Sequence, residues 1–443
     1  MWPSPLRIAS VLSLALAGVS PASGEEPVRA DAAWIRSWFP ALRQEMETLP
    51  PFFRDTKLNL HLRTFYLNRT STTPGNASSN NAEGANSTPT VAEALATGGW
   101  LEYRSGWLLD TFSMGAVGYL SEPLYAPSDR DGTLLLAPGQ EGYAVLGQAW
   151  IALRYKEYAV LKGPRQLVDE GYVNPHDSRM TPNTFEGPTL SGQIGPVEYF
   201  GSFLTKEKPR NQDNFVWMTQ QAGIVRHDNG LAVASVRVSP WQSLVIYAAE
   251  YYLPDGFNTA FGRISYDTSL GGDWKLALGF QYTDQRSVGA QLLGDFVTWN
   301  TGGQARLSYG GASILAAFAF TGQGNNIQTP FGKWPGYLSY QIKNFDLANQ
   351  NAWGVGLAYD FERLGLRGLT ASLIYAEGAN AVKPGTSTAL PNEREADFRS
   401  DWVAPDNVLR GFSFTFRAAG VNQGSQRLQT EFRLIVNYEI PAL

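Results

Sequence analysis

The sequence predicts an all-β fold, a transmembrane antiparallel β-barrel of about 18 strands with a short N-terminal helix. Three observations predict this fold class: apolar residues alternate with polar or small ones along most of the chain, apolar runs begin or end in aromatic residues, and the N-terminus has the pattern of an export signal. The chain has 443 residues, of which 43% are hydrophobic, 13% aromatic and only 17% charged. Aromatic residues at this frequency argue against disorder, because they are normally buried or in contact with lipid.

Composition also excludes several classes of protein. The chain has no cysteine, which excludes a disulfide scaffold, a thiol enzyme and a cysteine-type zinc site. A net charge of −5 provides no broad basic field for nucleic acid. The three histidines, His61, His176 and His227, have no evident catalytic partners, and glycine-rich phosphate loops are absent. We therefore expect no catalytic residues, no metal and no cofactor.

Residues 1–24 have the features of a secretory signal peptide. Arg7 supplies a short positive region, residues 8–19 are uncharged and mostly apolar, and small residues at Ala22 and Gly24 suit a signal peptidase. A membrane anchor is the alternative, but a spanning helix requires roughly 20 residues. We predict cleavage after Gly24.

Residues 25–56 are predicted to form an N-terminal periplasmic segment with a short helix. Apolar residues between positions 32 and 49, including Trp34, Trp38, Leu42 and Met46, follow spacings of three and four. Pro50-Pro51 should end the helix. We interpret this segment as a cap on the barrel, and a plug or an amphipathic helix at its mouth is the alternative.

From residue 57 to residue 443 the dominant period is two. Between Trp274 and Tyr282 every second residue is large and apolar, and the residues between them are Lys, Ala, Gly and Gln. Such alternation predicts strands, because successive side chains point to opposite faces. A soluble sandwich is the alternative, but a sandwich rarely sustains alternation over so long a chain. A wide barrel instead directs its apolar face to lipid and its polar face to a wet lumen.

The predicted strands are separated by short turns and long loops in alternation, as expected for the two rims of a membrane barrel. Short turns are predicted at 228–230, 271–273 and 310–311, and long loops at about 69–97, 121–143, 163–192, 286–301, 322–351 and 378–392. The predicted strands are 57–68, 100–109, 114–120, 148–156, 197–205, 222–228, 231–239, 244–252, 260–268, 274–282, 303–309, 313–321, 353–361, 369–375, 395–402, 412–418 and 428–440.

Four segments, in the right order, resemble the OprD family of outer-membrane porins. Residues 430–438 (TEFRLIVNY) resemble the family's last strand, 413–417 (SFTFR) the strand before it, and 62–69 (LRTFYLNR) its first strand. Residues 177–187 (DSRMTPNTFEG) are similar to its third, inward-folded loop. The resemblance implies an 18-stranded monomeric barrel in the bacterial outer membrane; a trimer is the alternative.

The resemblance also implies a function and a set of partners. We expect contact with outer-membrane lipids and passage of small anionic or zwitterionic solutes, such as amino acids and aromatic acids. In the family, a ladder of arginines guides the carboxylate past a constriction formed by infolded loops. The sequence departs from this pattern at Thr415, where the ladder tends to carry a second arginine beside Arg417.

Eight arginines lie opposite the apolar face of a predicted strand. A guanidinium that faces lipid at the bilayer midplane costs about 2–4 kcal/mol, so the lumen is favoured. Arginine also keeps its charge and pairs bidentately with carboxylates. The alternative is that these arginines pair with lumenal acids, such as Glu102, Asp360, Asp397 and Glu431, and only stiffen the wall. The eight are Arg63, Arg104, Arg154, Arg263, Arg306, Arg399, Arg417 and Arg433.

The loop at 163–192 carries charges of both signs, which suits a narrow eyelet with a transverse field. The resemblance places Asp177, Ser178 and Arg179 near the constriction. The alternative is that Asp177 and Arg179 only pin the loop to the wall. In the loop at 322–351, Asp346 stands where the family has an acidic constriction residue.

The sequence thus predicts a channel for passive, substrate-preferring uptake of small solutes, which we expect to carry a carboxylate. The alternative is an outer-membrane barrel enzyme or structural adhesin without an open pore, which would depend on His61 or on a serine.

Overall fold

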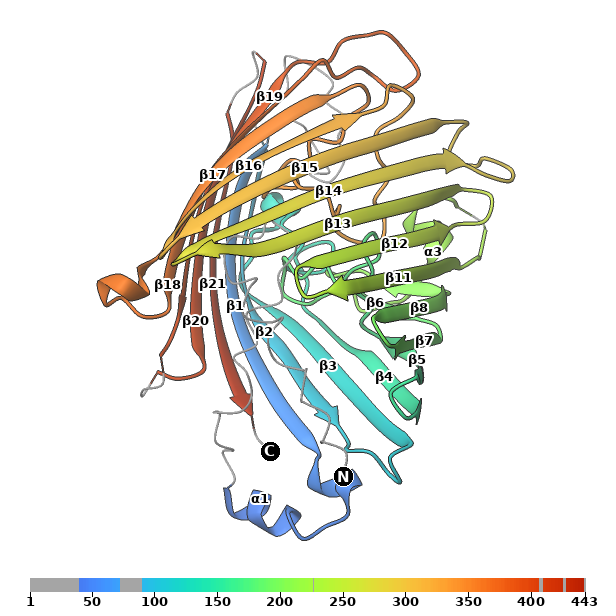
Figure 1. Cartoon of the computed structure of the whole chain (residues 1–443), viewed down its shortest axis with the longest axis vertical. Helices are drawn as coiled ribbons and strands as arrows, with labels where there is room; N and C mark the ends of the chain where they lie inside the picture. The colour runs from blue at the N-terminus through green and yellow to red at the C-terminus, as the bar shows by residue number, and fades with distance from the viewer. Residues whose placement is uncertain (1–39, 72–89, 226, 406–408, 425–427, 442–443) are drawn as a thin grey trace.

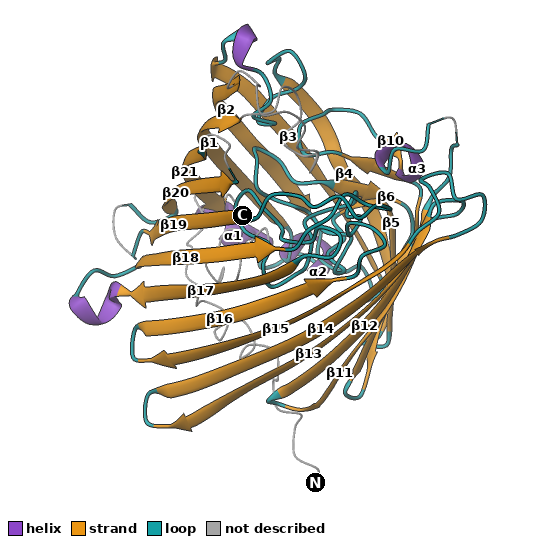
Figure 2. Ribbon diagram, turned by 90° about the horizontal axis from the view of Figure 1, so that it is seen from above, coloured by secondary structure: helices purple, strands orange, loops and turns teal. Residues whose placement is uncertain are grey.

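The computed structural model describes residues 40–71, 90–225, 227–405, 409–424 and 428–441. The strands form one antiparallel sheet that closes on itself, because β1 (Lys57–Ser71) pairs with β21 (Gln429–Pro441) as well as with β2 (Thr90–Arg104). Figure 1 shows the barrel from the side and Figure 2 shows it from above. Eighteen strands of the described chain form the wall, which confirms the predicted fold class.

The remaining strands are short extensions of this wall. β6 and β9 continue β7 and β8 beyond brief interruptions, and β10 pairs with β9. The other strands are β3 (Phe112–Tyr125), β4 (Tyr143–Tyr155), β5 (Ala159–Gln166), β6 (Thr184–Glu186), β7 (Thr189–Ile194), β8 (Val197–Leu204), β9 (Lys206–Lys208), β10 (Val216–Trp217), β11 (Leu231–Trp241), β12 (Leu244–Tyr252), β13 (Phe257–Gly271), β14 (Trp274–Ser287), β15 (Val297–Tyr309), β16 (Ala312–Thr321), β17 (Asn351–Asp360), β18 (Leu369–Ala379), β19 (Glu393–Val403) and β20 (Phe412–Gln423). The helices are α1 (Pro40–Met46), α2 (Pro51–Arg54) and α3 (Met218–Gln221), with 3₁₀ turns at η1 (Ser128–Arg130) and η2 (Phe361–Leu364).

The apolar faces of the strands point outward. On β14, Leu278 and Phe280 are 42% and 50% exposed, whereas Gln281 and Thr283, at alternate positions, are buried. A soluble protein would reverse this order, since it buries its apolar face. The outward band of large apolar side chains is the surface that a lipid bilayer covers.

The two rims of the barrel differ. At the rim where β1 begins and β21 ends, β13 and β14 are joined only by residues 272–273, and β15 and β16 only by 310–311. Gly272 (φ 57°) and Gly310 (φ 58°) occupy the left-handed region that such tight turns require. The opposite rim carries the long loops, so the rim with the short turns is the periplasmic one.

The described part of the N-terminal segment lies at the periplasmic rim. Helix α1 ends at Met46, and α2 begins anew with Pro51 in its first turn. The Gly106 amide donates to the Phe52 carbonyl over 2.9 Å, and the Phe52 ring stacks on Phe112. Figure 1 shows α1 beyond the ends of the strands. The predicted signal peptide and the start of the predicted helix lie outside the described residues. No helix in the described part of the chain is long and apolar enough to cross a membrane.

Several predicted boundaries are wrong. The predicted strand 100–109 runs past the end of β2 at Arg104, the predicted loop 121–143 overlaps β3, which extends to Tyr125, and the predicted loop 286–301 overlaps β15, which begins at Val297. The described residues of the predicted strand 222–228 (222–225 and 227–228) are not in a strand, so 228–230 is the end of a long connection to β11 and not a short turn. The predicted loop 163–192 contains most of β7 and the end of β5, where Gly163-Pro164 interrupts the alternation. The predicted loop 69–97 is too long, because β1 extends to Ser71 and β2 begins at Thr90. The bounds of β1, β2, β5 and β7 follow from pairing with neighbouring strands, and local alternation does not report such pairing.

Candidate functional site

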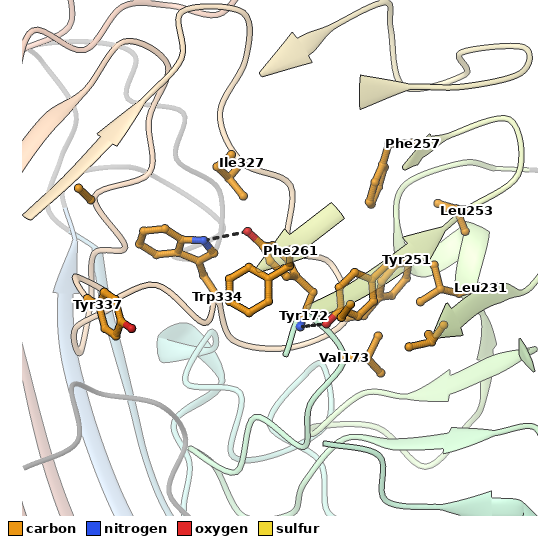
Figure 3. Packing of buried hydrophobic residues seen from close by; sticks show 14 of the residues in the cluster. Tyr172, Val173, Leu231, Tyr251, Leu253, Phe257, Phe261, Ile327, Trp334 and Tyr337 are labelled. Carbon is orange, nitrogen blue, oxygen red and sulfur yellow. Dashed lines mark hydrogen bonds between the residues drawn. The ribbon is translucent and has the colours of Figure 1, made fainter. Parts of the chain in front are cut away.

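Two long loops fold into the lumen instead of standing above the rim. Figure 2 shows loops crossing the interior of the barrel, and residues 167–183 and 322–350 supply many of the buried side chains there. The Tyr172 hydroxyl of the first loop accepts from Trp334 Nε1 of the second loop over 3.2 Å and shares a 2.8 Å hydrogen bond with the Thr283 hydroxyl of β14. Its ring packs against Tyr251 and Phe261 of the wall (Figure 3). Aromatic packing therefore fixes both loops to the β12–β14 side.

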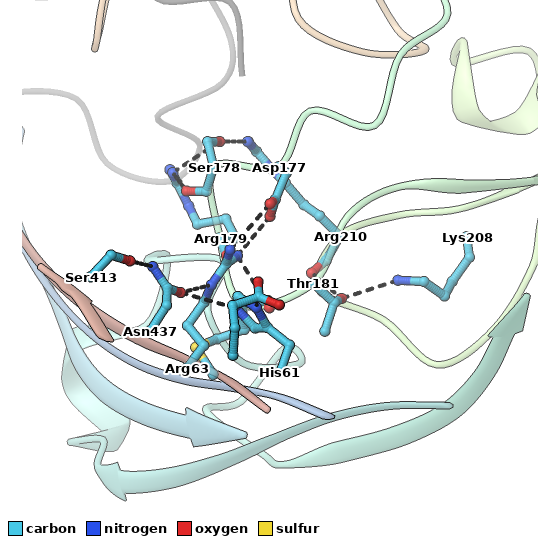
Figure 4. A network of polar contacts seen from close by, with 12 residues as sticks. His61, Arg63, Asp177, Ser178, Arg179, Thr181, Lys208, Arg210, Ser413 and Asn437 are labelled. Atoms are coloured by element: carbon cyan, nitrogen blue, oxygen red, sulfur yellow. Dashed lines mark hydrogen bonds and ion pairs between the residues drawn. The ribbon is translucent and has the colours of Figure 1, made fainter. Parts of the chain in front are cut away.

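On the opposite side, Arg63 of β1 holds the first loop (Figure 4). Its guanidinium donates to Asp177 Oδ1 over 2.7 Å and to the Arg179 carbonyl over 2.6 Å, while Nε donates to Asn437 Oδ1 over 2.8 Å. The side chains of Arg63 and Asp177 are 5% and 6% exposed. The structure thus brings together two residues predicted from the sequence, in a buried ion pair that anchors the loop to the wall.

The next two residues of the loop, Ser178 and Arg179, contact other loops. Arg179 Nε donates to the Thr133 carbonyl over 2.7 Å, which links this loop to the loop between β3 and β4. Arg210, from the connection that follows β9, donates to Ser178 Oγ over 2.5 Å and lies 2.8 Å from His176 Nε2. Burial, reinforced by Arg433 and Arg69, lowers the pKa of Arg210 to about 9, so the guanidinium remains charged at neutral pH.

Three predicted arginines form a row across neighbouring strands. Arg399 of β19 lies opposite Arg417 of β20, which lies opposite Arg433 of β21. All three occupy inward positions, since the alternate residues Phe398 and Leu434 face outward. Opposed side chains on adjacent strands lie about 5 Å apart at Cβ, so the three guanidinium groups create a continuous positive strip.

Carboxylates restrain parts of this strip. Glu431, fully buried, pairs with both Arg433 and Arg69, and Arg399 donates to Asp401 Oδ1 over 3.0 Å. Lys333 of the second loop lies beside the row, but burial together with Arg417 and Arg433 lowers its pKa well below the usual value, which favours the neutral amine. The excess of positive charge comes from the guanidinium groups, because Arg69, Arg399, Arg417 and Arg433 outnumber the two carboxylates paired with them, Glu431 and Asp401.

Acidic residues of β19 anchor the second loop. Glu395 accepts the amides of Ile342 and Lys343 over 2.8 and 2.7 Å, and Asp397 accepts that of Gln341 over 3.1 Å. In the same loop Asp346 is 2% exposed, and burial, followed by the nearby Glu393, raises its pKa to about 7. Asp346 therefore belongs to the buried base of the loop.

The other four predicted arginines lie apart from the row. Arg263 of β13 donates to Gln281 Oε1 over 3.1 Å and to the Pro335 carbonyl, and so braces the second loop from the far wall. Arg306 of β15 lies near Asp267. Arg154 pairs with Asp110 at the periplasmic rim and covers Trp107. Arg104 ends β2 at that same rim.

Both ring nitrogens of His61 have polar partners within hydrogen-bond distance. Nδ1 lies 2.6 Å from Glu439 Oε1 and Nε2 lies 3.1 Å from Asn437 Oδ1, while the ring stacks on Trp100 with centroids 3.7 Å apart. Neither nitrogen points to a serine hydroxyl in the described contacts. This environment gives His61 a packing role.

Sequence reasoning missed Arg69, Arg210 and Lys333. Arg69 lies an even number of residues from Arg63 and so shares its face, and extension of the predicted first strand (57–68) by one residue would have identified it as lumenal. Arg210 and Lys333 lie in loops without periodicity, and no sequence signal places them beside the row.

Comparisons with known proteins agree with this geometry. The model of the family described as outer membrane porin, OprD family, matches residues 50–442. The porin-like protein GalP of Pseudomonas putida is 22% identical over 409 residues, which cover 88% of this chain and 93% of that protein.

Solved structures show the same fold. OccK9 (OpdG) of Pseudomonas aeruginosa has a TM-score of 0.78 at 24% identity, covering 88% of this chain and all of the other. A BenF-like porin of Pseudomonas fluorescens Pf-5 has a TM-score of 0.77 at 20% identity with the same coverage, and OpdK of P. aeruginosa, solved with vanillate, has 0.74 at 19%, again with 88% and 100% covered. The family model spans almost all of the chain outside the predicted signal peptide, and the barrel, the infolded loops and the outward apolar band fit it: the chain belongs to the OprD family of outer-membrane porins.

Proposed function

We propose that this outer-membrane channel favours small solutes that carry a carboxylate. The observation that supports the proposal most is the row of Arg399, Arg417 and Arg433 on adjacent strands at the level of the infolded loops. Guanidinium groups bind carboxylates through paired hydrogen bonds, and several weak sites in series allow an anion both to enter and to leave. OpdK, a relative in fold, was solved with vanillate, an aromatic carboxylate, which is consistent with this class of solute.

In this proposal the remaining predicted site residues have two roles. Asp177, Ser178 and Arg179 shape the constriction by fixing the first loop to β1, and Asp346 supports the second loop from its buried base. Arg63, Arg263, Arg306, Arg104 and Arg154 add positive potential along the lumen. Field strength inside a narrow pore depends on the sum of such charges, so residues away from the row still affect anion passage.

The proposal is tested by uptake into liposomes that contain the purified protein. We compare a carboxylate with a neutral solute of similar size that a lipid bilayer excludes, for example gluconate with glucose. Arg417→Gln should slow gluconate uptake about tenfold or more, because one charge-assisted contact contributes about 1.5–3 kcal/mol, and should leave glucose uptake nearly unchanged.

The matched control is Arg363→Gln. Arg363 lies in the turn η2 at the periplasmic rim, exposed and paired with Asp273, so this variant removes a guanidinium outside the lumen. It should alter neither uptake rate. Equal slowing of both solutes by Arg417→Gln would contradict a role in selecting carboxylates and would assign the arginine to pore shape.

A further inference from the structure

Two further cations lie beside a tryptophan on a different wall of the lumen, below the constriction. The group consists of Arg104 on β2, Trp150 on β4 and Lys162 on β5, and we name it the β2–β5 patch. Arg104 lies opposite Gly115, and Gly115 lies opposite Trp150. Lys162 lies opposite Ala152, two residues from Trp150 on the same face. The intervening residues Leu101, Ile151 and Leu161 face lipid, so all three members of the patch face the lumen.

Gly115 determines how the tryptophan sits. A Cβ atom at this position would lie only 2.4 Å from Trp150 Cζ2, so the ring occupies the space above the glycine, between β4 and β2. Lys162 Nζ lies 4.4 Å from the centroid of the same ring. The patch therefore joins a fixed aromatic ring to a cation, with Arg104 beyond Gly115 on the other side.

These cations differ from those of the constriction in their partners. Arg63 and Arg433 each have a carboxylate within ion-pair distance. Among the residues that the structure describes, neither Arg104 nor Lys162 forms an ion pair or a side-chain hydrogen bond. Glu102 is the acid that acts on Lys162 electrostatically, and its Oε2 accepts from Asn59 over 3.5 Å. Two cations beside one carboxylate leave an excess positive charge next to an apolar ring.

We propose that the β2–β5 patch is a second carboxylate subsite, which receives an organic anion after the constriction and favours anions with a flat apolar body. The inference rests on the proposed preference for carboxylates. Arg104 and Lys162 bind the carboxylate by charge-assisted hydrogen bonds, and Trp150 contacts the apolar body through its ring. A site of this kind on the periplasmic half gives the anion a second weak binding point before release, as conduction requires.

The test uses single-channel currents in planar bilayers, with benzoate or acetate as the permeant anion and the half-saturating concentration as the readout. Replacement of both cations (Arg104→Gln with Lys162→Gln) should raise this concentration about tenfold for both anions, equivalent to about 1.4 kcal/mol. Trp150→Leu should raise it for benzoate and leave the value for acetate unchanged. Trp150→Phe, which keeps a ring, should restore most of the benzoate affinity.

The matched control is Lys275→Gln. Lys275 is an exposed lysine at the periplasmic end of β14 and occupies an inward position on a distant part of the wall. This variant therefore removes one lumenal positive charge, as each patch substitution does, but at a distance from the patch. It should leave both half-saturating concentrations nearly unchanged. If the patch variants behave like Lys275→Gln while the wild-type channel passes benzoate, the subsite is refuted and the proposed function stands. If the wild-type channel passes neither benzoate nor acetate, the proposed function itself fails.

Discussion

Asp401 controls how much positive charge the arginine row presents to the lumen. Its carboxylate accepts from Arg399 over 3.0 Å and from Thr415 Oγ1 over 2.7 Å. Thr415 is the position where the family ladder tends to carry a second arginine beside Arg417. In this chain a neutral hydroxyl fills the place, and Asp401 offsets the charge of Arg399. Under the proposed function, this departure from the family pattern weakens the positive field along β19 and β20.

This effect predicts the result of adding the missing charge. Thr415→Arg places a guanidinium beside Asp401, which frees Arg399 from its partner and adds one positive charge to the strip. The ratio of anion to cation permeability, measured from zero-current potentials in planar bilayers, should rise several-fold.

Thr415→Leu provides the control, because it removes the hydroxyl without adding charge. It should leave the permeability ratio nearly unchanged. A similar rise in both variants would show that side-chain volume at this position, and not charge, sets the selectivity.

Strand alternation was sufficient to predict the residues of this strip. Arg417 and Arg433 lie on inward positions because their neighbours are large and apolar, and that pattern is local. Asp177 was found through resemblance, but its buried pairing with Arg63 depends on how a loop folds back across the lumen. The positions of Arg210 and Lys333 depend on the same folding of loops into the lumen. Neither residue lies in a periodic sequence pattern that would predict its position.

At the scale of elements, the two infolded loops are held by different chemistry on their two sides. Aromatic packing around Tyr172 and Trp334 fixes them to β12–β14, and buried ionic contacts fix them to β1 and β19. A buried charge that loses its partner is strongly destabilising, since nothing replaces its lost hydration. The ionic anchors should therefore be sensitive points of the constriction.

Removal of Arg63 tests the first anchor. Arg63→Ala leaves Asp177 buried without its partner and should lower the free energy of unfolding by about 3–5 kcal/mol. Urea unfolding in lipid vesicles measures this change, and single-channel recordings should also show increased current noise as the loop loosens. Arg363→Ala, which breaks the exposed pair with Asp273, should cost no more than about 1 kcal/mol. Equal costs for the two variants would contradict the anchoring role.

The second loop should respond to pH through Asp346. Burial, followed by the nearby Glu393, raises its pKa to about 7, so the folded protein favours the protonated carboxyl. Its stabilising contribution is fully present below the ordinary pKa of about 4 and is lost as the pH rises through about 7. Thermal melting in detergent should show that the wild-type protein loses more stability between about pH 5 and about pH 8 than Asp346→Asn does. Parallel pH profiles would exclude Asp346 as the titrating group.

For the molecule as a whole, the sequence was sufficient to predict a closed barrel and its outward apolar face. Alternation, aromatic ends of strands and turns such as 271–273 and 310–311 are local signals of that architecture. The path of β5 and β7 was not predictable in this way, because Gly163-Pro164 and Gly192 break the alternation and only pairing with β4 and β8 identifies these strands. The predicted signal peptide at 1–24 stays a prediction, and we expect the mature chain to begin at Glu25.

The zero-current potential of the wild-type channel tests the account most directly. Purified protein in a planar bilayer, under a gradient of potassium acetate, should give an open-channel conductance and a potential whose sign shows preference for acetate over potassium. The arginine row predicts that sign, because Arg399, Arg417, Arg433 and the neighbouring Arg69 outnumber the carboxylates paired with them, Glu431 and Asp401. A potential of the opposite sign would contradict the preference for carboxylates, and the absence of any conductance would contradict an open channel.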